Sequence, residues 1–123
     1  PMPGAAALLV RLGRRYPVAV ASNGASAMQR AKLAASGLDG LVAQVVISQE
    51  IGWAKPDARF FQHATGLIGC APAMTLMVGD HPENDIAGAH AAGLRTCWLR
   101  HPWHPVPQQA DRCVDHLDEV EPA

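Results

Sequence analysis

The chain has 123 residues, of which 49% are hydrophobic and 17% are charged; this length predicts one compact domain and leaves little room for a second. Ten Lys and Arg residues against 11 Asp and Glu residues give a formal net charge of -1 at pH 7. The chain therefore lacks the excess positive charge with which proteins bind nucleic acids or anionic membranes. No apolar run approaches the roughly 20 residues that span a bilayer, and the N-terminus does not follow the signal-peptide pattern. We expect no nucleic-acid partner and no membrane partner.

Cysteine and histidine positions disfavour both a disulfide framework and a zinc site. The three cysteines, Cys70, Cys97 and Cys113, are odd in number and far apart, so we expect free thiols in a reducing cytoplasm. His101 and His104 lie close together in a loop with three prolines. Zinc takes three or four ligands, and no cysteine has a suitable spacing to complete such a site. A structural metal site in that loop therefore has little support.

Helical and strand-like patterns alternate along the chain, with short connections between them. Apolar residues at helical spacing or in short uninterrupted runs predict these elements in chain order: a helix at 4–15, a strand at 18–21, a helix at 25–36 closed by Gly37, a strand at 44–47, a helix from Pro56 through Ile68, a strand at 74–78, a helix at 83–92, a strand at 95–99, a loop at 101–107, a short edge strand at 113–114 and a last helical turn at 116–120. This alternation predicts an α/β fold, a three-layer Rossmann-like parallel sheet with helices on both faces.

Polar residues follow three of the predicted strands. Ser22 ends the strand at 18–21, Asp80 follows the strand at 74–78, and Lys55 opens the helix after the strand at 44–47. Ligands of parallel sheets bind beyond the carboxyl ends of the strands. A hydroxyl, an ammonium and a carboxylate are therefore expected at one edge of the sheet.

The turn Ser22-Asn23-Gly24 and the lysine after it fit an anion. A hydroxyl and successive backbone N–H groups at a strand-to-helix turn bind anions, helped by the helix N-terminus that follows. The alternative is that Ser22 simply caps the next helix. Lys55 is one of only two lysines, and it either neutralises a phosphate as a point charge or is an ordinary solvated lysine.

Two carboxylates beyond the strand at 74–78 fit a hard cation. Asp80 and Asp85 lie on the loop and first helical turn after that strand, and Mg²⁺ commonly takes one or two protein carboxylates together with waters and phosphate oxygens. The alternative is that Asp80 only ends the strand, while Glu83 and Asp85 complement the helix dipole. His81 lies beside Asp80 and is a weaker candidate for contact with a substrate.

Three segments in order carry a family resemblance. Residues 18–24 form an apolar strand that ends in Ser-Asn-Gly, residues 48–61 include Gly-Trp-Ala-Lys-Pro-Asp around Lys55, and residues 78–99 begin with Val-Gly-Asp. In this order and spacing they resemble the second, third and fourth motifs of the haloacid dehalogenase (HAD)-like hydrolases. The most similar subfamily holds phosphoglycolate phosphatases, dehalogenases and pyrimidine nucleotidases, and the resemblance covers most of the chain.

The resemblance implies a Mg²⁺-dependent phosphohydrolase that acts on a small phosphomonoester, a small phosphorylated metabolite, through an aspartyl-phosphate intermediate. The residues that the motifs imply are Ser22, Asn23 and Lys55 for phosphate binding, Lys55, Asp80 and Asp85 for catalysis, and Asp80 and Asp85 for Mg²⁺. A dehalogenase is the weaker interpretation, because that chemistry does not need metal-binding carboxylates. The alternative from another class is a non-catalytic HAD-like remnant that serves as a binding or assembly module.

The sequence departs from the family at its N-terminal side. The family's nucleophilic Asp lies in a D-x-D pattern before the second motif, but the first acidic residue here is Asp39, which already follows Ser22. The helical cap between the first and second motifs is missing as well. We therefore expect residues 1–123 to form a partial core domain that is inactive alone, as a natural or cloned fragment or as the ordered part of a longer chain.

The missing segment has a consequence for the sheet. In HAD-like relatives the nucleophile strand lies between the strands that correspond to 18–21 and 74–78. Without it, these two strands pair directly, take up a strand from another chain, or stay apart at about twice the usual 4.8 Å spacing. We expect the gap, because the flanking motifs show no adaptation to closure.

Overall fold

Five short strands form the centre of the computed structural model, which describes residues 4–121. The helices and strands in chain order are α1 (Ala5–Gly13), β1 (Ala19–Ser22), α2 (Ser26–Ser36), the 3₁₀ helix η1 (Leu38–Leu41), β2 (Gln44–Ile47), α3 (Ser48–Ile51), α4 (Ala58–Ile68), the 3₁₀ helix η2 (Pro72–Met74), β3 (Leu76–Gly79), the π-helix η3 (Pro82–Ala87), α5 (Gly88–Ala91), β4 (Arg95–Leu99), β5 (Arg112–Val114) and the 3₁₀ helix η4 (Leu117–Glu119). Across residues 4–121, no helix has the length and apolar character that crossing a membrane requires.

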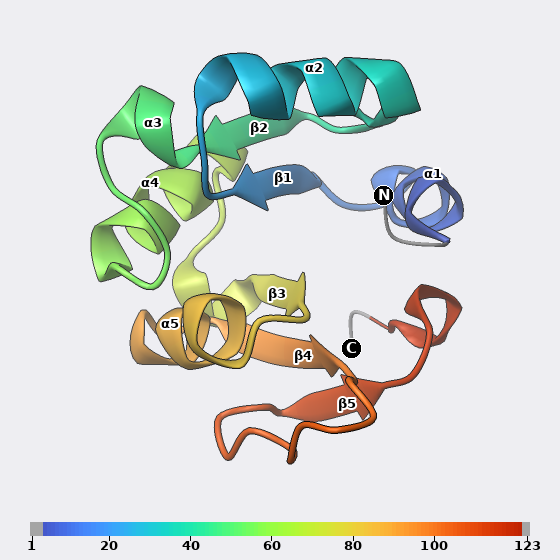
Figure 1. Ribbon diagram of the computed structural model, residues 1–123, viewed down its shortest axis with the longest axis vertical. Helices are drawn as coiled ribbons and strands as arrows, with labels where there is room; N and C mark the ends of the chain where they lie inside the picture. Colours follow the sequence, from blue (N-terminus) through green and yellow to red (C-terminus); the bar gives the residue numbers. More distant parts are fainter. Residues whose placement is uncertain (1–3, 122–123) are drawn as a thin grey trace.

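The strands belong to two sheets, each made of parallel strands. The two sheets are separated by a gap that lies between β1 and β3 (Figure 1). β1 pairs with β2, where Val20 lies opposite Val45, and β3, β4 and β5 form the second sheet in that order. Within residues 4–121 no ladder hydrogen bonds join β1 to β3, which confirms the expectation that these two strands do not pair directly. The predicted α/β class with parallel strands is confirmed, with two sheets in place of one.

The strands on either side of the gap are less buried than the strands behind them. Every residue of β1 is only half-buried, whereas Val46 and Ile47 of β2 are 1% and 0% exposed. In the second sheet, Leu76, Met77 and Val78 of β3 are half-buried, while the middle of β4 is buried. The two strands that border the gap are thus apolar but incompletely covered.

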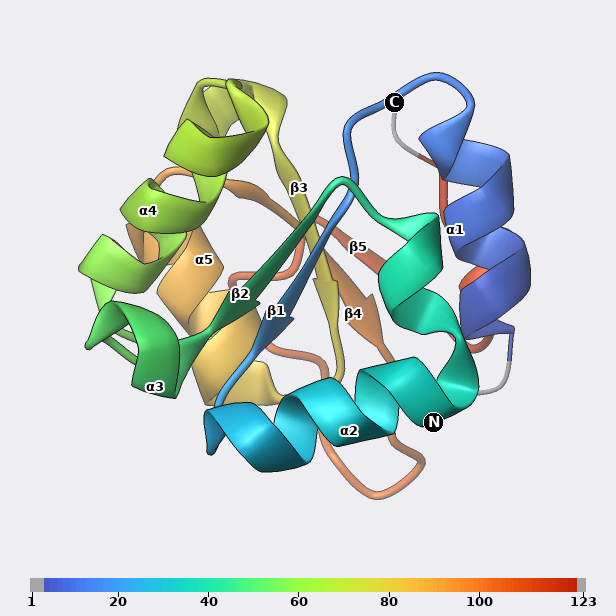
Figure 2. The same cartoon turned by 90° about the horizontal axis from the view of Figure 1, so that it is seen from above.

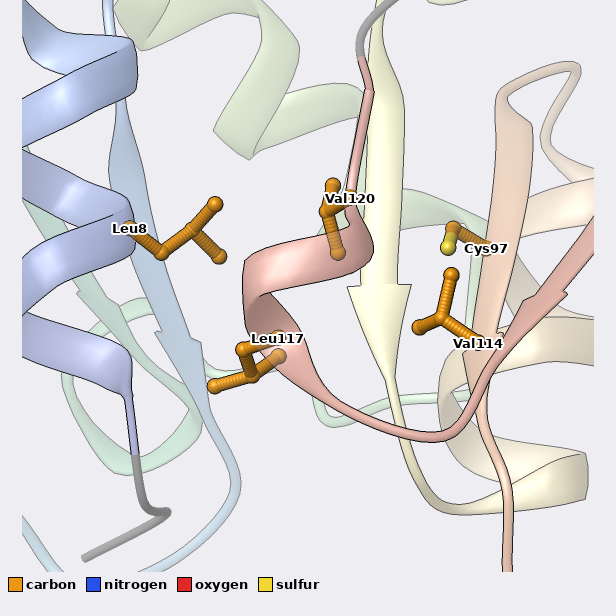
Figure 3. Packing of buried hydrophobic residues seen from close by; sticks show 5 residues of the cluster. All are labelled: Leu8, Cys97, Val114, Leu117 and Val120. Atoms are coloured by element: carbon orange, nitrogen blue, oxygen red, sulfur yellow. The ribbon is translucent and has the colours of Figure 1, made fainter.

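Two hydrophobic clusters pack on opposite faces of the strands. One joins Leu8 of α1 to residues of β4, β5 and η4, as Figure 3 shows with Leu8, Cys97, Val114, Leu117 and Val120. The other packs the α4 and α5 side against β2, through Val46, Phe60, Phe61, Ala89 and Leu94. Seen from above, α4 and α5 lie on one side of the strands and α1 on the other (Figure 2). This is the layered arrangement that the alternating pattern predicted.

Two helix predictions need correction. The helix expected from Pro56 begins at Ala58, because Asp57 is its N-cap and accepts a hydrogen bond from the Arg59 N–H at 2.9 Å. The single helix expected at 83–92 is a π-helix at Pro82–Ala87 followed by α5. π-Helical turns occur often at functional sites, and local sequence spacing does not reveal them.

The N-terminus of α2 is capped by α3 and not by Ser22. Its N-cap residue, Ala25, has no side chain to do so. Instead, Ser48 Oγ accepts from the Gly24 N–H at 2.8 Å, Gln49 accepts from the Ser26 N–H, and Glu50 accepts from the Ser26 hydroxyl. The alternative that Ser22 caps this helix is therefore wrong.

Glu50 also binds Arg30 through two hydrogen bonds of 2.7 Å. The hydrogen bonds from Arg30 and then from Ser26 lower the pKa of Glu50 to about 2. Because α3 side chains already occupy N–H groups at this end of α2, the help that the helix N-terminus was expected to give an anion is not available from those groups.

Candidate active site

Lys55 joins the two sheets at their carboxyl edge. Its side chain is only 9% exposed, and its ammonium donates to Asp85 Oδ1 at 2.6 Å and to the Ala21 carbonyl at 3.1 Å. Ala21 precedes the end of β1, and Asp85 lies on η3, which follows β3. The lysine is therefore no ordinary solvated residue: it is a buried cation that links the segments on either side of the gap.

Asn23 fixes the backbone of that lysine. Its side-chain amide accepts from the Lys55 N–H and donates to the Lys55 carbonyl, both at 2.9 Å. The Asn23 side chain thus makes the two hydrogen bonds with the Lys55 backbone that a neighbouring strand residue would make. The family resemblance implied phosphate binding for Asn23. No local pattern predicted this contact with a residue 32 positions away.

Asp85 is held on both carboxylate oxygens. Oδ1 accepts from Lys55, and Oδ2 accepts from the His81 N–H at 3.1 Å. Gly79 makes room for it, because a Cβ at that position would lie 2.6 Å from both Cβ and Cγ of Asp85. Asp85 is 6% exposed, so its charge is offset inside the protein by Lys55.

Asp80 is placed differently. Its carboxylate is 41% exposed and comes no closer than 4.0 Å to His101, whereas its backbone carbonyl accepts from Trp98 Nε1 and contacts His101 Nε2, both at 3.0 Å. It lines a cavity of about 210 Å³ at the carboxyl ends of β3, β4 and β5. The cavity is lined by Asp80, Leu99, Arg100, His101, Asp115, His116 and Leu117.

Ser22 is the last residue of β1 and directly follows Ala21, whose carbonyl binds Lys55. Among residues 4–121 its hydroxyl makes no hydrogen bond, and it is half-buried. The structure thus brings Lys55, Asp85 and Asn23 into direct contact and places Ser22 next to this group. Asp80 is connected to it through the peptide that it shares with His81.

The fit of these residues to Mg²⁺ differs between the two aspartates. Within the described part of the chain, no three His, Cys, Asp or Glu side chains gather as a metal-binding group. Asp85 is the poorer candidate for a direct ligand, because its two oxygens already accept hydrogen bonds from Lys55 and from a backbone N–H. The half-exposed carboxylate of Asp80 fits, since Mg²⁺ takes as few as one protein carboxylate together with waters and phosphate.

The histidines have structural partners. His81 is the N-cap of η3, where its Nδ1 accepts from the Asn84 N–H at 3.0 Å. His101 contacts the Asp80 carbonyl, and His104 packs edge-on against Trp98 with ring centroids 5.8 Å apart. Sequence reasoning missed Trp98, which is fully buried, as a partner of Asp80.

A buried lysine–aspartate pair at the carboxyl edge of parallel strands, beside an exposed aspartate, is an arrangement that suits phosphoryl chemistry. Residues 1–93 match the family described as haloacid dehalogenase-like hydrolase. The chain belongs to this family, as its three motifs indicated.

The chain is also similar to individual phosphatases and nucleotidases and to a HAD-hydrolase of known structure. The chain is 40% identical over 121 residues to a phosphoserine phosphatase of Thermus thermophilus, covering 96% of this chain and 49% of the relative. It is 41% identical over 100 residues to the pyrimidine 5'-nucleotidase YjjG of Escherichia coli, covering 80% and 44%. The crystal structure of the HAD-hydrolase YfnB from Bacillus subtilis, bound to magnesium, superposes with a TM-score of 0.89 at 30% identity, covering 96% of this chain and 53% of YfnB. The chain spans about half the length of these relatives.

Proposed function

We propose that this chain is part of a HAD-like phosphohydrolase that acts on a small phosphomonoester, a small phosphorylated metabolite. The observation that supports it most is the Lys55–Asp85 pair at 2.6 Å, which keeps a buried cation next to the Ser22 turn. The similarity to a phosphoserine phosphatase and a pyrimidine 5'-nucleotidase favours phosphate esters over haloacids as substrates.

In this proposal the phosphate lies at the end of β1. The Ser22 hydroxyl and the Asn23 N–H donate to its oxygens, and Lys55 balances its charge while orienting the nucleophile. Asp85 holds the lysine ammonium in place, and the Asn23 side chain holds the lysine backbone. Positioning and electrostatics thus supply most of the acceleration.

Asp80 is the residue of this chain that would hold Mg²⁺. When bound, the ion would neutralise charge on the phosphate oxygens as the transition state develops. Asp85 would act one step away, through the lysine and the His81 N–H.

The nucleophile of the proposed reaction comes from outside residues 1–123, because no acidic residue precedes Asp39. An aspartate oxygen would attack phosphorus, the P–O bond to the substrate alcohol would break, and water would then hydrolyse the aspartyl-phosphate. Residues 1–123 would then form a partial core domain without a cap, with the nucleophile strand entering the gap between β1 and β3. We further propose a cytoplasmic location, with no nucleic-acid or membrane partner.

A chimera tests this function. The N-terminal half of the Thermus thermophilus phosphoserine phosphatase is fused ahead of Pro1, and hydrolysis of p-nitrophenyl phosphate is measured with and without Mg²⁺. The 123-residue chain alone should be no faster than buffer, and the chimera should be active. Lys55→Ala should abolish that activity, whereas Lys32→Ala should not, because Lys32 is the other lysine and lies exposed on α2. Turnover by the chain alone, or activity that survives Lys55→Ala, would contradict the proposal.

The alternative function is a non-catalytic HAD-like module that binds a partner. Among residues 4–121, β1 and β3 each have one edge without a pairing strand, and this favours the alternative, since a strand from another chain could add there. An inactive chimera, together with stoichiometric binding of the Thermus N-terminal half in trans, would support this alternative.

A further inference from the structure

The peptide group between Asp80 and His81 is hydrogen-bonded at both of its ends. Its carbonyl contacts Trp98 Nε1 and His101 Nε2, each at 3.0 Å, and its N–H donates to Asp85 Oδ2 at 3.1 Å. A single peptide therefore connects Asp80 on one side with the Lys55–Asp85 pair on the other.

His101 has to be a donor in this contact. A carbonyl oxygen only accepts, so the hydrogen must lie on His101 Nε2. The same nitrogen is 4.0 Å from Asp80 Oδ2, which is too far for a hydrogen bond. The imidazole therefore restrains Asp80 through its backbone and leaves the carboxylate free.

The two donors are themselves held in place. Trp98 is 0% exposed in the middle of the second sheet, and the His101 ring packs edge-on against it with centroids 6.2 Å apart. His101, the first residue of the loop whose histidines had no role in the predicted chemistry, thus contacts the residue that follows β3.

We propose that His101 is a positioning residue for Asp80. Together with Trp98 it fixes the Asp80–His81 peptide, and this aims the exposed carboxylate while keeping the His81 N–H directed at Asp85. Hydrogen bonds to the carbonyl also polarise the peptide and strengthen the bond from its N–H. Partners of metal-binding residues typically change metal affinity 10- to 100-fold when they are removed. The proposal rests on the metal role of Asp80 in the proposed function.

The test uses the 123-residue chain and Mn²⁺ as the probe, with binding followed by electron paramagnetic resonance. His101→Leu removes the donor and should weaken Mn²⁺ binding about 10-fold. His101→Gln, whose amide can donate from a similar position, should restore most of it. His104→Leu is the matched control, because His104 packs against the same tryptophan without reaching Asp80, and it should change binding less than about twofold on that same scale.

A second readout needs no metal. Hydrogen exchange of the His81 amide should become at least about tenfold faster in His101→Leu than in His104→Leu, because the peptide loses one of its restraints.

The possible outcomes separate the two proposals. Equal Mn²⁺ affinity in wild type and His101→Leu, an equal loss in His104→Leu, or no rescue by His101→Gln overturns the positioning role. If Asp80→Asn binds Mn²⁺ as well as wild type does, the metal assignment of the proposed function fails, and His81 exchange then decides whether His101 holds the peptide.

Discussion

Removal of one partner of the buried Lys55–Asp85 pair should cost far more stability than removal of one partner of a surface ion pair of similar length. The side chains of the buried pair are 9% and 8% exposed and its N···O distance is 2.6 Å. Removal of one partner leaves a buried charge and typically costs about 3–5 kcal/mol. For a chain of this size, with a total stability of about 6–18 kcal/mol at the usual amount per residue, that is a large fraction.

A double-mutant cycle measures this effect. Lys55→Met and Asp85→Asn should each lower the free energy of unfolding by about 3 kcal/mol, while the double variant, which buries no charge, should lose no more than either single one. Urea denaturation followed by circular dichroism gives the four values.

The matched control is the Arg30–Glu50 pair, which has a similar N···O distance of 2.7 Å but side chains that are 52% and 29% exposed. Its cycle, with Arg30→Met and Glu50→Gln, should give the smaller coupling because water screens the charges. A buried-pair coupling no larger than that of the exposed pair would refute the reasoning.

Three further predictions concern packing, pH and the lysine backbone. Gly88→Ala should destabilise by about 1–3 kcal/mol, since its Cβ would lie 2.7 Å from Pro56 Cβ, whereas Gly66→Ala, with open space around it, should stabilise by up to about 1 kcal/mol; thermal unfolding compares them. The hydrogen bonds from Arg30 and Ser26 lower the pKa of Glu50 from 4.5 to about 2. The stability that the Glu50 carboxylate contributes is therefore fully present above pH 4.5 and is lost as the pH falls toward 2, and Glu50→Gln should flatten the dependence of the unfolding free energy on pH in that window. Asn23→Ala should reduce kcat/KM of the chimera about 10- to 100-fold through misplacement of the lysine, and activity equal to wild type would contradict this.

Local sequence patterns predicted the strands well, because each is a short apolar run with clear boundaries. The predicted strands at 18–21, 44–47 and 95–99 match β1, β2 and β4 within one residue. The strand predicted at 74–78 needs correction, because Met74 ends η2 and β3 begins at Leu76. Gly37, expected at the end of a helix, does adopt the left-handed conformation there with φ of 73°. These features depend on residues that are neighbours in sequence.

What sequence reasoning could not supply depends on distant partners. The cap of α2 by residues 48–50 follows from contacts between segments more than 20 residues apart. The resemblance implied that Asp85 supports the metal or the lysine, and the structure adds that one oxygen accepts from the lysine and the other from a backbone N–H. The spacing of residues along the chain does not show which partner each carboxylate oxygen takes.

The capping of α2 by α3 has a consequence for how the molecule opens. α2 has no buried residue, and its N-cap residue makes no side-chain capping hydrogen bond. A helix of 11 residues is marginal in water without tertiary support. The N-terminal hydrogen bonds of α2 come from residues more than 20 positions later, so α2 and α3 should unfold together as one local unit. A short loop that begins at Asn23 joins Ser22, the last residue of β1, to this unit. Local unfolding of α2 and α3 would therefore disturb the proposed phosphate site at a lower free energy than global unfolding.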